Sequence, residues 1–464
     1  MRVFPKKFLW GGASSGPQSE GRFNKQHANV FDYWYENNPE DFFDYVGPDT
    51  ASDFYHNYEQ DIIQLKELGF NSLRLSIQWT RLVDDFENAT VNEDGVNFYK
   101  DVFKTMIDND IEPIVCLYHF DLPIEIYEKY GGWESKKVVD LFTHYAKQCF
   151  SLFGEMVNQW YVFNEPKVAA EGQYLFKYHY PKIYSPSKYF QATYHFILAT
   201  AKVIEVFRTF DFPKKKTVGT ILNLTPAYPA SNSKEDLKAA KKADLLNSKI
   251  YLDPAIHGEF PEELISLLEE DGVIWESTKQ ELDIIKNNTI DKLGVNYYHP
   301  ERVQRPEVIP TRADDWYPNR HYNNYKKPGR VMNIDKGWEV YPKGLYDISM
   351  IIKNEYKNIP WYVSENGMGI SREERFINEN NQIEDDYRIE FIHKHLEELY
   401  KGINAGSNCF GYHMWTPIDN WSWKNAYKNR YGLVSNNIHT QERTVKKSGL
   451  WFKEVAVKNS IDIQ

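Results

Sequence analysis

Hydrophobic and polar positions along this chain alternate between two patterns. Short, nearly continuous apolar runs are followed by longer stretches of helical periodicity, often with Gly or Asn-Asp before the next run. In residues 59–70, for example, Ile62, Leu65 and Leu68 lie on one helical face, and Gly69 ends the helix before the run SLRLSIQW. Runs that are apolar on both faces are typical of parallel strands buried between layers of helices.

The apolar runs predict eight strands. They cover residues 8–13, 72–79, 112–119, 159–164, 217–223, 292–298, 361–364 and 408–415. Because a helical stretch follows each strand, we expect an α/β fold with a single (β/α)8 TIM barrel spanning residues 1–464 as one domain; a doubly wound open sheet is the alternative. The spacing exceeds 60 residues after the fifth and sixth strands, so residues 225–290 and 299–360 are expected to form long decorating loops on the C-terminal face.

Composition narrows the class of protein. The 464 residues are 42% hydrophobic and 26% charged, which is enough apolar material for a large core. Acidic residues outnumber basic ones by 66 to 55, so the net charge of −11 argues against nucleic acid and anionic membranes as partners.

Three cysteines (Cys116, Cys149 and Cys409) exclude a disulfide framework. With no apolar run of signal-peptide or membrane-span length, we expect a cytoplasmic protein; its oligomeric state stays open.

Two glutamates stand where predicted strands end. Glu165 follows the fourth strand in FNEP, and Glu365 follows the seventh in SENG. Active sites of (β/α)8 barrels lie at these ends, and glycoside hydrolysis needs one carboxyl as proton donor and another as nucleophile or base. A glutamate beside a turn is more often a helix cap or a solvated charge. However, the neighbouring strand ends carry further polar and aromatic residues, namely Gln18, Glu20, Arg74, His119, Asp121, Asn164, Asn296, Tyr298 and Trp415. Together they favour a glycosidase.

Other catalytic motifs find little support. Residues 12–16 match G-x-S-x-G, but no Asp and His follow in the required roles. The chain contains no P-loop, no dinucleotide-binding glycine motif, no H-E-x-x-H and no C-x-x-C, and its 13 histidines are scattered. We therefore expect neither a metal nor another cofactor.

Seven motifs, in this order, resemble glycoside hydrolase family 1: FLWGGASS, QSEG, LYHFDLP, FNEP, GVNYY, SENG and WTPIDNWSW. The resemblance implies a retaining β-glycosidase on a (β/α)8 barrel, with Glu165 as general acid/base and Glu365 as nucleophile. It also implies that Arg74 and Tyr298 keep Glu365 ionised, while Glu165 needs a raised pKa. The implied glycone-binding residues are Gln18, His119 and Asn164, with Trp415 as a stacking floor. Phe120 replaces a common Trp, and Ser364 replaces a common Thr.

The loop after the eighth strand is expected to contact the substituent on the sixth carbon of the sugar. Members that act on plain glucosides have a Glu at the position of Ser422, and a Glu there would oppose a phosphate by about 4 kcal/mol per charge pair at contact. Members that act on 6-phospho-sugars carry a Ser, Lys and Tyr signature; this chain has Ser422 and Tyr431, but Asn429 stands at the Lys position. Of the loop cations Lys424, Lys428 and Arg430, we expect Lys424 to supply the missing charge. The predicted phosphate-binding set is Ser422, Lys424, Asn429 and Tyr431.

The sequence thus predicts a 6-phospho-β-glycosidase whose partner is a small phosphorylated β-glycoside. Trp423, the neighbour of Ser422, is expected to contact the substrate but does not separate gluco from galacto substrates, and we favour 6-phospho-β-glucosides with some galacto activity. Such enzymes normally act on sugars phosphorylated during import. If Asn429 means that the phosphate site is lost, the alternative is an ordinary β-glucosidase. A more remote alternative is a sugar-binding barrel without catalysis.

Overall fold

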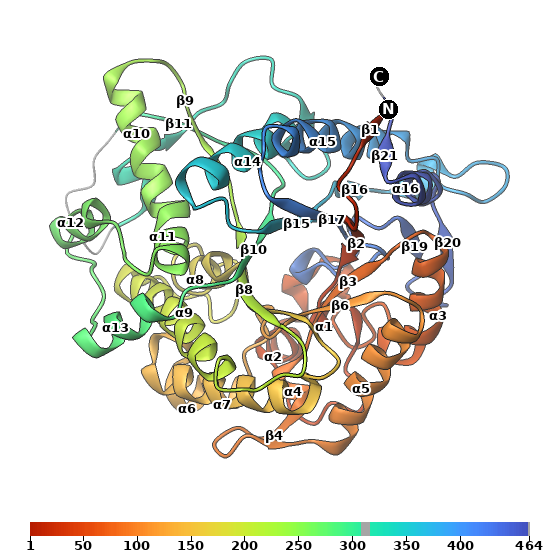
Figure 1. Ribbon diagram of the computed structural model, residues 1–464, viewed down its shortest axis with the longest axis horizontal. Coiled ribbons are helices and arrows are strands. Elements are labelled where there is room, and N and C mark those ends of the chain that lie inside the picture. The colour runs from red at the N-terminus through yellow and green to blue at the C-terminus, as the bar shows by residue number, and fades with distance from the viewer. Residues whose placement is uncertain (308–315, 463–464) are drawn as a thin grey trace.

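Eight parallel strands form a closed barrel in the computed structural model of the protein, which describes residues 1–307 and 316–462 (Figure 1). The strands are β2 (Leu9–Ala13), β3 (Ser72–Ser76), β6 (Glu112–Cys116), β7 (Gln159–Asn164), β8 (Thr217–Asn223), β10 (Lys292–Asn296), β15 (Trp361–Asn366) and β17 (Cys409–Trp415). Each strand pairs with the next of this series, and β17 pairs with β2 to close the ring. The predicted (β/α)8 barrel is confirmed, and the open-sheet alternative is wrong.

The predicted strands agree with the structure apart from their ends. β7 and β8 have the predicted bounds, whereas β3, β6 and β10 end two or three residues earlier. At those ends the chain leaves the barrel ladder and its next residues, such as His119, line a cavity instead. The apolar run therefore continues past the strand because the mouth of the barrel is also buried.

Helices surround the barrel (Figure 1). The longer ones are α3 (Phe54–Glu67), α5 (Glu93–Asp108), α7 (Lys136–Phe153), α9 (Pro186–Phe207), α14 (Lys343–Glu355), α15 (Asp386–Asn404) and α16 (Lys447–Lys458). α3 illustrates their origin, because the predicted stripe of Ile62, Leu65 and Leu68 is buried against the core. Gly69 follows its end with φ +81°, a conformation that only glycine adopts at little cost.

Shorter elements decorate the barrel. The helices are α1 (Gly16–Ser19), α2 (Val30–Asn37), α4 (Trp79–Leu82), α6 (Ile124–Tyr130), α8 (Pro166–Tyr174), α10 (Lys234–Asp244), α11 (Ile250–Ile256), α12 (Glu262–Glu270) and α13 (Lys279–Asn287). The strands are β1 (Arg2–Val3), β4 (Val83–Asp85), β5 (Thr90–Val91), β9 (Ala227–Pro229), β11 (Glu301–Gln304), β12 (Asn323–Asn324), β13 (Met332–Asn333), β14 (Trp338–Glu339), β16 (Ile370–Ser371), β18 (Asn429–Arg430), β19 (Val434–Asn436), β20 (Arg443–Val445) and β21 (Ser460–Ile461).

The two long stretches predicted as decoration do carry these extra elements. Residues 225–290 contain β9 and α10 to α13, and the described part of 299–360 contains β11 to β14 before α14. β9 and β11 pair with each other, so the two insertions join into one small sheet beside α10 (Figure 1). Residues 308–315, which belong to the second stretch, lie outside the described residues. β1 and β21 pair as well and hold the two ends of the described chain side by side.

The barrel interior is packed rather than hollow. Ile114, Cys116, Tyr161, Ile221 and Tyr362 form a buried cluster contributed by four strands. All three cysteines are buried and unpaired, as expected for residues used in packing. Among the described residues, no helix has both the length and the apolarity needed to cross a membrane. Because side chains fill the interior of the barrel, polar side chains are accommodated at its C-terminal mouth.

Candidate active site

Strand register brings the predicted site residues to one level of the barrel. Asn296 is opposite Glu365, and Arg74 is opposite Ala13, which in turn is opposite Trp415. Strands far apart in the sequence therefore deliver their last side chains to the same end, as a closed parallel barrel requires.

Glu365 lies between two hydrogen-bond donors. The guanidinium of Arg74, which is fully buried, contacts its Oε1, and the Tyr298 hydroxyl donates to its Oε2 at 2.6 Å. Burial raises the pKa of Glu365 above its ordinary value, whereas Arg74 and Tyr298 act in the opposite direction. Both contacts favour the carboxylate form and fix the direction of its oxygens.

Glu165 sits in a different environment. It directly precedes α8 in a left-handed conformation (φ 47°), and Asn296 Nδ2 donates to its Oε1 at 2.9 Å. Burial first, and the negative charge of Glu365 second, raise the pKa of Glu165 to about 8. Glu165 therefore favours the protonated form at neutral pH, whereas at Glu365 the contacts with Arg74 and Tyr298 oppose the effect of burial.

Both glutamates line a cavity of about 540 Å³ at the barrel mouth. Of the residues predicted for the site, the lining includes Gln18, His119, Glu165, Tyr298, Glu365, Trp415, Ser422, Trp423, Lys424 and Tyr431. Arg74 and Asn164 lie behind this lining and hydrogen-bond each other at 3.2 Å, and Arg74 Nη1 is also 3.1 Å from His119 Nδ1. The structure thus gathers all but one of the predicted residues around one space.

One wall of this cavity is flat and partly aromatic. The rings of His119 and Trp415 stack with centroids 5.9 Å apart and an interplanar angle of 18°. Burial and the charge of Arg74 hold the pKa of His119 well below its usual range, so the ring is neutral. The Gln18 amide is oriented by Ser15 Oγ at 2.8 Å and by the carbonyl of Trp421 at 2.9 Å. A flat wall of rings beside an oriented amide suits a sugar, because the sugar can pack its face on the rings and direct its hydroxyls to the amide.

Three polar side chains line another part of the cavity. Ser422 Oγ, Tyr431 Oη and Lys424 Nζ make no hydrogen bond or ion pair with any residue that the structure describes. Gly369 makes room for the Tyr431 ring, because a Cβ at that glycine would come within 2.4 Å of Tyr431 Cζ. These donors are held in place by packing and are available to a ligand.

Unlike Arg74 and Asn164, which lie directly behind the lining, Asn429 is turned away from the cavity. It is buried, and its Nδ2 donates to the backbone carbonyl of Asp335 at 3.4 Å. Its amide is thus turned to a neighbouring segment, and a contact between Asn429 and phosphate stays a prediction. Lys428 lies over the Phe43 ring and Arg430 donates to the Asn436 carbonyl, so neither lines the cavity.

Two further acidic residues near the strand ends have structural partners. Glu20 accepts from Arg81 Nε at 2.7 Å and from Tyr99, and Asp121 accepts from the backbone amides of His119 and Trp79. They orient the loops and do not line the cavity.

The cavity also contains residues that the sequence reasoning missed. They are Phe120, Val168, Tyr178, His179, Asn223, Thr225, Asn296, His299, Lys336, Trp338 and Asn425. The sequence analysis names Asn296 and Phe120 but predicts no role for either in the site. Asn223 is the last residue of the predicted fifth strand, so the strand-end criterion could have found it. Lys336 and Trp338 come from the β13–β14 hairpin, which carries no motif.

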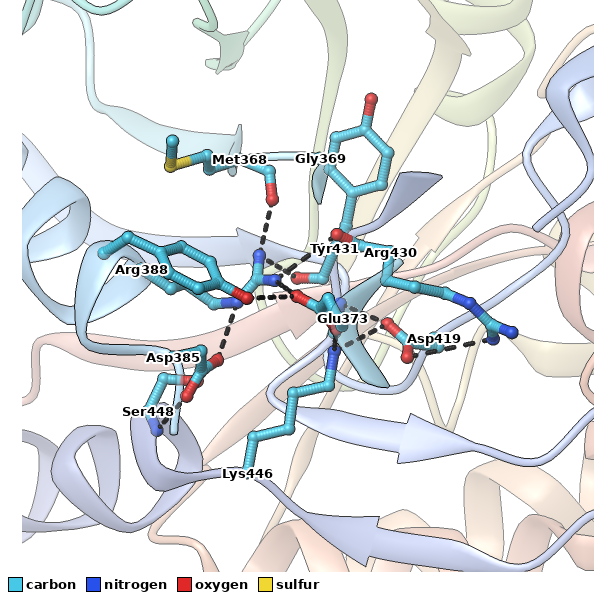
Figure 2. Close-up of polar contacts among 12 residues, drawn as sticks. Met368, Gly369, Glu373, Asp385, Arg388, Asp419, Arg430, Tyr431, Lys446 and Ser448 are labelled. Carbon is cyan, nitrogen blue, oxygen red and sulfur yellow. Dashed lines mark hydrogen bonds and ion pairs between the residues drawn. The ribbon is translucent and has the colours of Figure 1, made fainter. Parts of the chain in front are cut away.

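Five buried charged residues lie beside the backbone of Tyr431, which lines the cavity (Figure 2). We call them the charge cluster: Glu373, Asp385, Arg388, Asp419 and Lys446. Arg388 contacts Glu373 and Asp385 and donates to the carbonyls of Met368 at 2.5 Å and Tyr431 at 3.1 Å. Lys446 Nζ bridges Glu373 at 2.5 Å and Asp419 at 3.1 Å. The cluster therefore fixes the backbone of Tyr431 and of the segment after β15.

Comparison with known proteins gives one consistent family. The protein named 6-phospho-beta-glucosidase GmuD from Bacillus subtilis is 47% identical over 456 residues, covering 98% of this chain and 97% of that protein. A 6-phospho-beta-galactosidase from Clostridium acetobutylicum is 33% identical, covering 99% of this chain and 98% of that protein. A solved family 1 β-glucosidase from Thermotoga maritima superposes with a TM-score of 0.90 at 29% identity, covering 100% of this chain and 99% of that one.

The family profile described as Glycosyl hydrolase family 1 matches residues 1–461. Together with the barrel and the glutamate pair at its mouth, this match shows that the chain is a glycosyl hydrolase that belongs to glycosyl hydrolase family 1.

Proposed function

We propose that this chain is one catalytic domain that hydrolyses 6-phospho-β-glucosides with retention of configuration, releasing a sugar 6-phosphate and an aglycone. The observation that carries the proposal is a single cavity lined by a glutamate pair and by three donors, Ser422, Lys424 and Tyr431, whose side chains have no polar partner among the described residues. A relative at 47% identity named as a 6-phospho-beta-glucosidase supports it.

In the first step, a Glu365 oxygen attacks the anomeric carbon while Glu165 gives its proton to the glycosidic oxygen, so the aglycone leaves as an alcohol. The raised pKa of Glu165, about 8, supports its role as the acid. Contacts from Arg74 and Tyr298 support Glu365 as the carboxylate nucleophile.

In the second step, Glu165, now ionised, takes a proton from water, and the resulting hydroxide oxygen bonds to the anomeric carbon as the bond to Glu365 breaks. Both carboxyls return to their starting forms, and two inversions give net retention. Every proton is exchanged between Glu165, water and the substrate, so we propose that no cofactor takes part.

The glycone preference rests on the relatives. Names of both gluco and galacto type occur among them, so we expect 6-phospho-β-galactosides to be hydrolysed more slowly than 6-phospho-β-glucosides. Since such substrates arise when sugars are phosphorylated on import, we propose that the enzyme works in the cytoplasm.

The proposal is tested by comparing hydrolysis of 4-nitrophenyl β-glucoside with that of its 6-phosphate, and of the galacto pair beside them. A preference of about a hundredfold in kcat/KM for the phosphorylated glucoside, about 2.7 kcal/mol of transition-state binding, is the expected result. Equal or faster hydrolysis of the plain glucoside would mean an ordinary β-glucosidase. No hydrolysis of any of the four would favour a sugar-binding barrel.

A further inference from the structure

Lys336 lines the same cavity as Ser422, Lys424 and Tyr431 but comes from a distant part of the chain. It stands in the turn between β13 and β14, which pair with each other. Its Nζ lies 4.8 Å from the centroid of the Trp338 ring, and within residues 1–307 and 316–462 it has no hydrogen bond and no ion pair. The half-buried ammonium therefore faces the cavity, and no described carboxylate forms an ion pair with it.

The hairpin that carries Lys336 is fastened through the residue before it. Asp335 accepts from Ser371 Oγ at 2.9 Å and from Arg375 Nη2 at 2.9 Å, and its carbonyl accepts from Asn429 Nδ2. Asn333 adds a hydrogen bond of 3.0 Å to the carbonyl of Gly369. Asn429 thus holds the backbone next to Lys336.

These anchors belong to the wall that also holds Tyr431. Ser371 and Asn429 are paired residues of the small sheet formed by β16 and β18, and Tyr431 follows β18 directly. Hydrogen bonds through this small sheet therefore connect the Lys336 hairpin with the segment of Tyr431, one of the residues predicted to bind phosphate.

Charge at this end of the cavity points to an anionic ligand. Burial, followed by the charges of Lys428 and Lys424, lowers the pKa of Lys336. Lysines that repel each other across a cavity, with no described carboxylate paired to either Lys336 or Lys424, are stabilised when a dianion binds between them. The adjacent hydroxyls of Ser422 and Tyr431 would donate to its remaining oxygens.

We propose that Lys336 binds the 6-phosphate of the substrate and supplies, with Lys424, the charge that the loop lacks at Asn429. In this arrangement Asn429 is a positioning residue, because it holds Asp335 and so aims Lys336 at the cavity. The inference rests on the proposed 6-phospho-glycosidase function and names the residue that determines its specificity.

The test measures kcat/KM for 4-nitrophenyl β-glucoside 6-phosphate and for the plain glucoside in Lys336→Gln, Lys336→Arg and Lys428→Gln. Lys336→Gln should lower the value for the phosphorylated substrate at least 20-fold, mainly through KM, and change the plain substrate less than threefold. Lys336→Arg should restore most of the loss. Lys428→Gln, the matched control from the same positive region but outside the lining, should leave both values within threefold.

Inhibition by glucose 6-phosphate provides a second measurement that needs no turnover of the phosphorylated substrate. Its inhibition constant should rise at least 20-fold in Lys336→Gln, while that of glucose stays the same. A wild-type enzyme that prefers the phosphorylated substrate and keeps this preference in Lys336→Gln would overturn the role of Lys336 alone. Equal losses on both substrates would mean a structural role and overturn it too. A wild-type enzyme without the preference would overturn the proposed function, and with it this inference.

Discussion

Removal of the Glu165 proton should set the upper pH limit of the reaction. The pKa of about 8 for Glu165, against an ordinary value of 4.5, corresponds to about 5 kcal/mol between its two protonation states. At pH 7 a carboxyl with pKa 8 is about 90% protonated, whereas one with pKa 4.5 is about 0.3% protonated. Burial and the charge of Glu365 thus make the acid about 300 times more available.

The perturbation is Glu165→Gln, which keeps the shape and the hydrogen bond with Asn296 but removes the transferable proton. We expect kcat/KM for an alkyl 6-phospho-β-glucoside to fall by about 10² to 10⁴, the usual contribution of general acid catalysis. A 4-nitrophenyl glycoside should lose less in the step that releases the phenol, because nitrophenolate leaves with little protonation.

The assay is the dependence of kcat/KM on pH between 5 and 10 for both enzymes. In the wild type, activity should fall as the pH rises through about 8, because Glu165 then loses its proton, and this fall should be absent in Glu165→Gln. The phosphate of the substrate ionises near pH 6, so it affects only the acidic side. A basic limb that is unchanged in Glu165→Gln, or one that lies near pH 5, would refute the reasoning.

Three further substitutions test separate parts of the structure. Ser422→Glu places a carboxylate against the phosphate at about 4 kcal/mol per contact, so the ratio of kcat/KM for phosphorylated over plain glucoside should fall at least a hundredfold; an unchanged ratio would remove Ser422 from the phosphate site. Gly369→Ala puts a Cβ within 2.4 Å of Tyr431 Cζ and should lower kcat/KM only for the phosphorylated glucoside, a prediction that equal losses on both substrates would contradict. Arg388→Met leaves Glu373 and Asp385 buried without their guanidinium and should lower the free energy of unfolding by about 3–5 kcal/mol in urea titrations; a change below about 1 kcal/mol would show that the charge cluster relaxes.

The barrel was predictable from sequence because its strands are buried on both faces and its helices on one. Residues 159–164 and 217–223 show this clearly, since the apolar runs coincide with β7 and β8. The predicted strand 112–119 extends beyond β6, because Leu117, Tyr118 and His119 are also buried although they follow the last residue of the strand. Hydrophobicity reports burial, and at the mouth of a barrel burial continues beyond hydrogen bonding between strands.

The glutamate pair was predictable for a related reason. Strand ends are local features, and parallel closure brings them together whatever their separation in sequence. The sequence therefore places Glu165 and Glu365 near each other, although it does not predict their different hydrogen-bond partners.

Lys336 could not be found in this way. It lies in a decorating hairpin whose position depends on contacts between side chains, such as that of Asp335 with Ser371, and no periodic pattern encodes such contacts. The departure at Asn429 was the available signal, because a phosphate site that lacks one cation must obtain charge from another segment. The same contacts explain why the amide of Asn429 faces Asp335 and not the cavity.

The most direct test of the central claim is to trap the covalent intermediate with 2-deoxy-2-fluoro-β-glucosyl fluoride 6-phosphate and with its unphosphorylated counterpart. Fluorine at C2 destabilises the oxocarbenium-like transition states, so the glycosyl-enzyme persists long enough for mass spectrometry. We predict that one sugar phosphate is added to the peptide that contains Glu365, that the phosphorylated reagent labels at least a hundred times faster, and that Glu365→Ala is not labelled. Labelling of another residue, or faster labelling by the unphosphorylated reagent, would contradict the account.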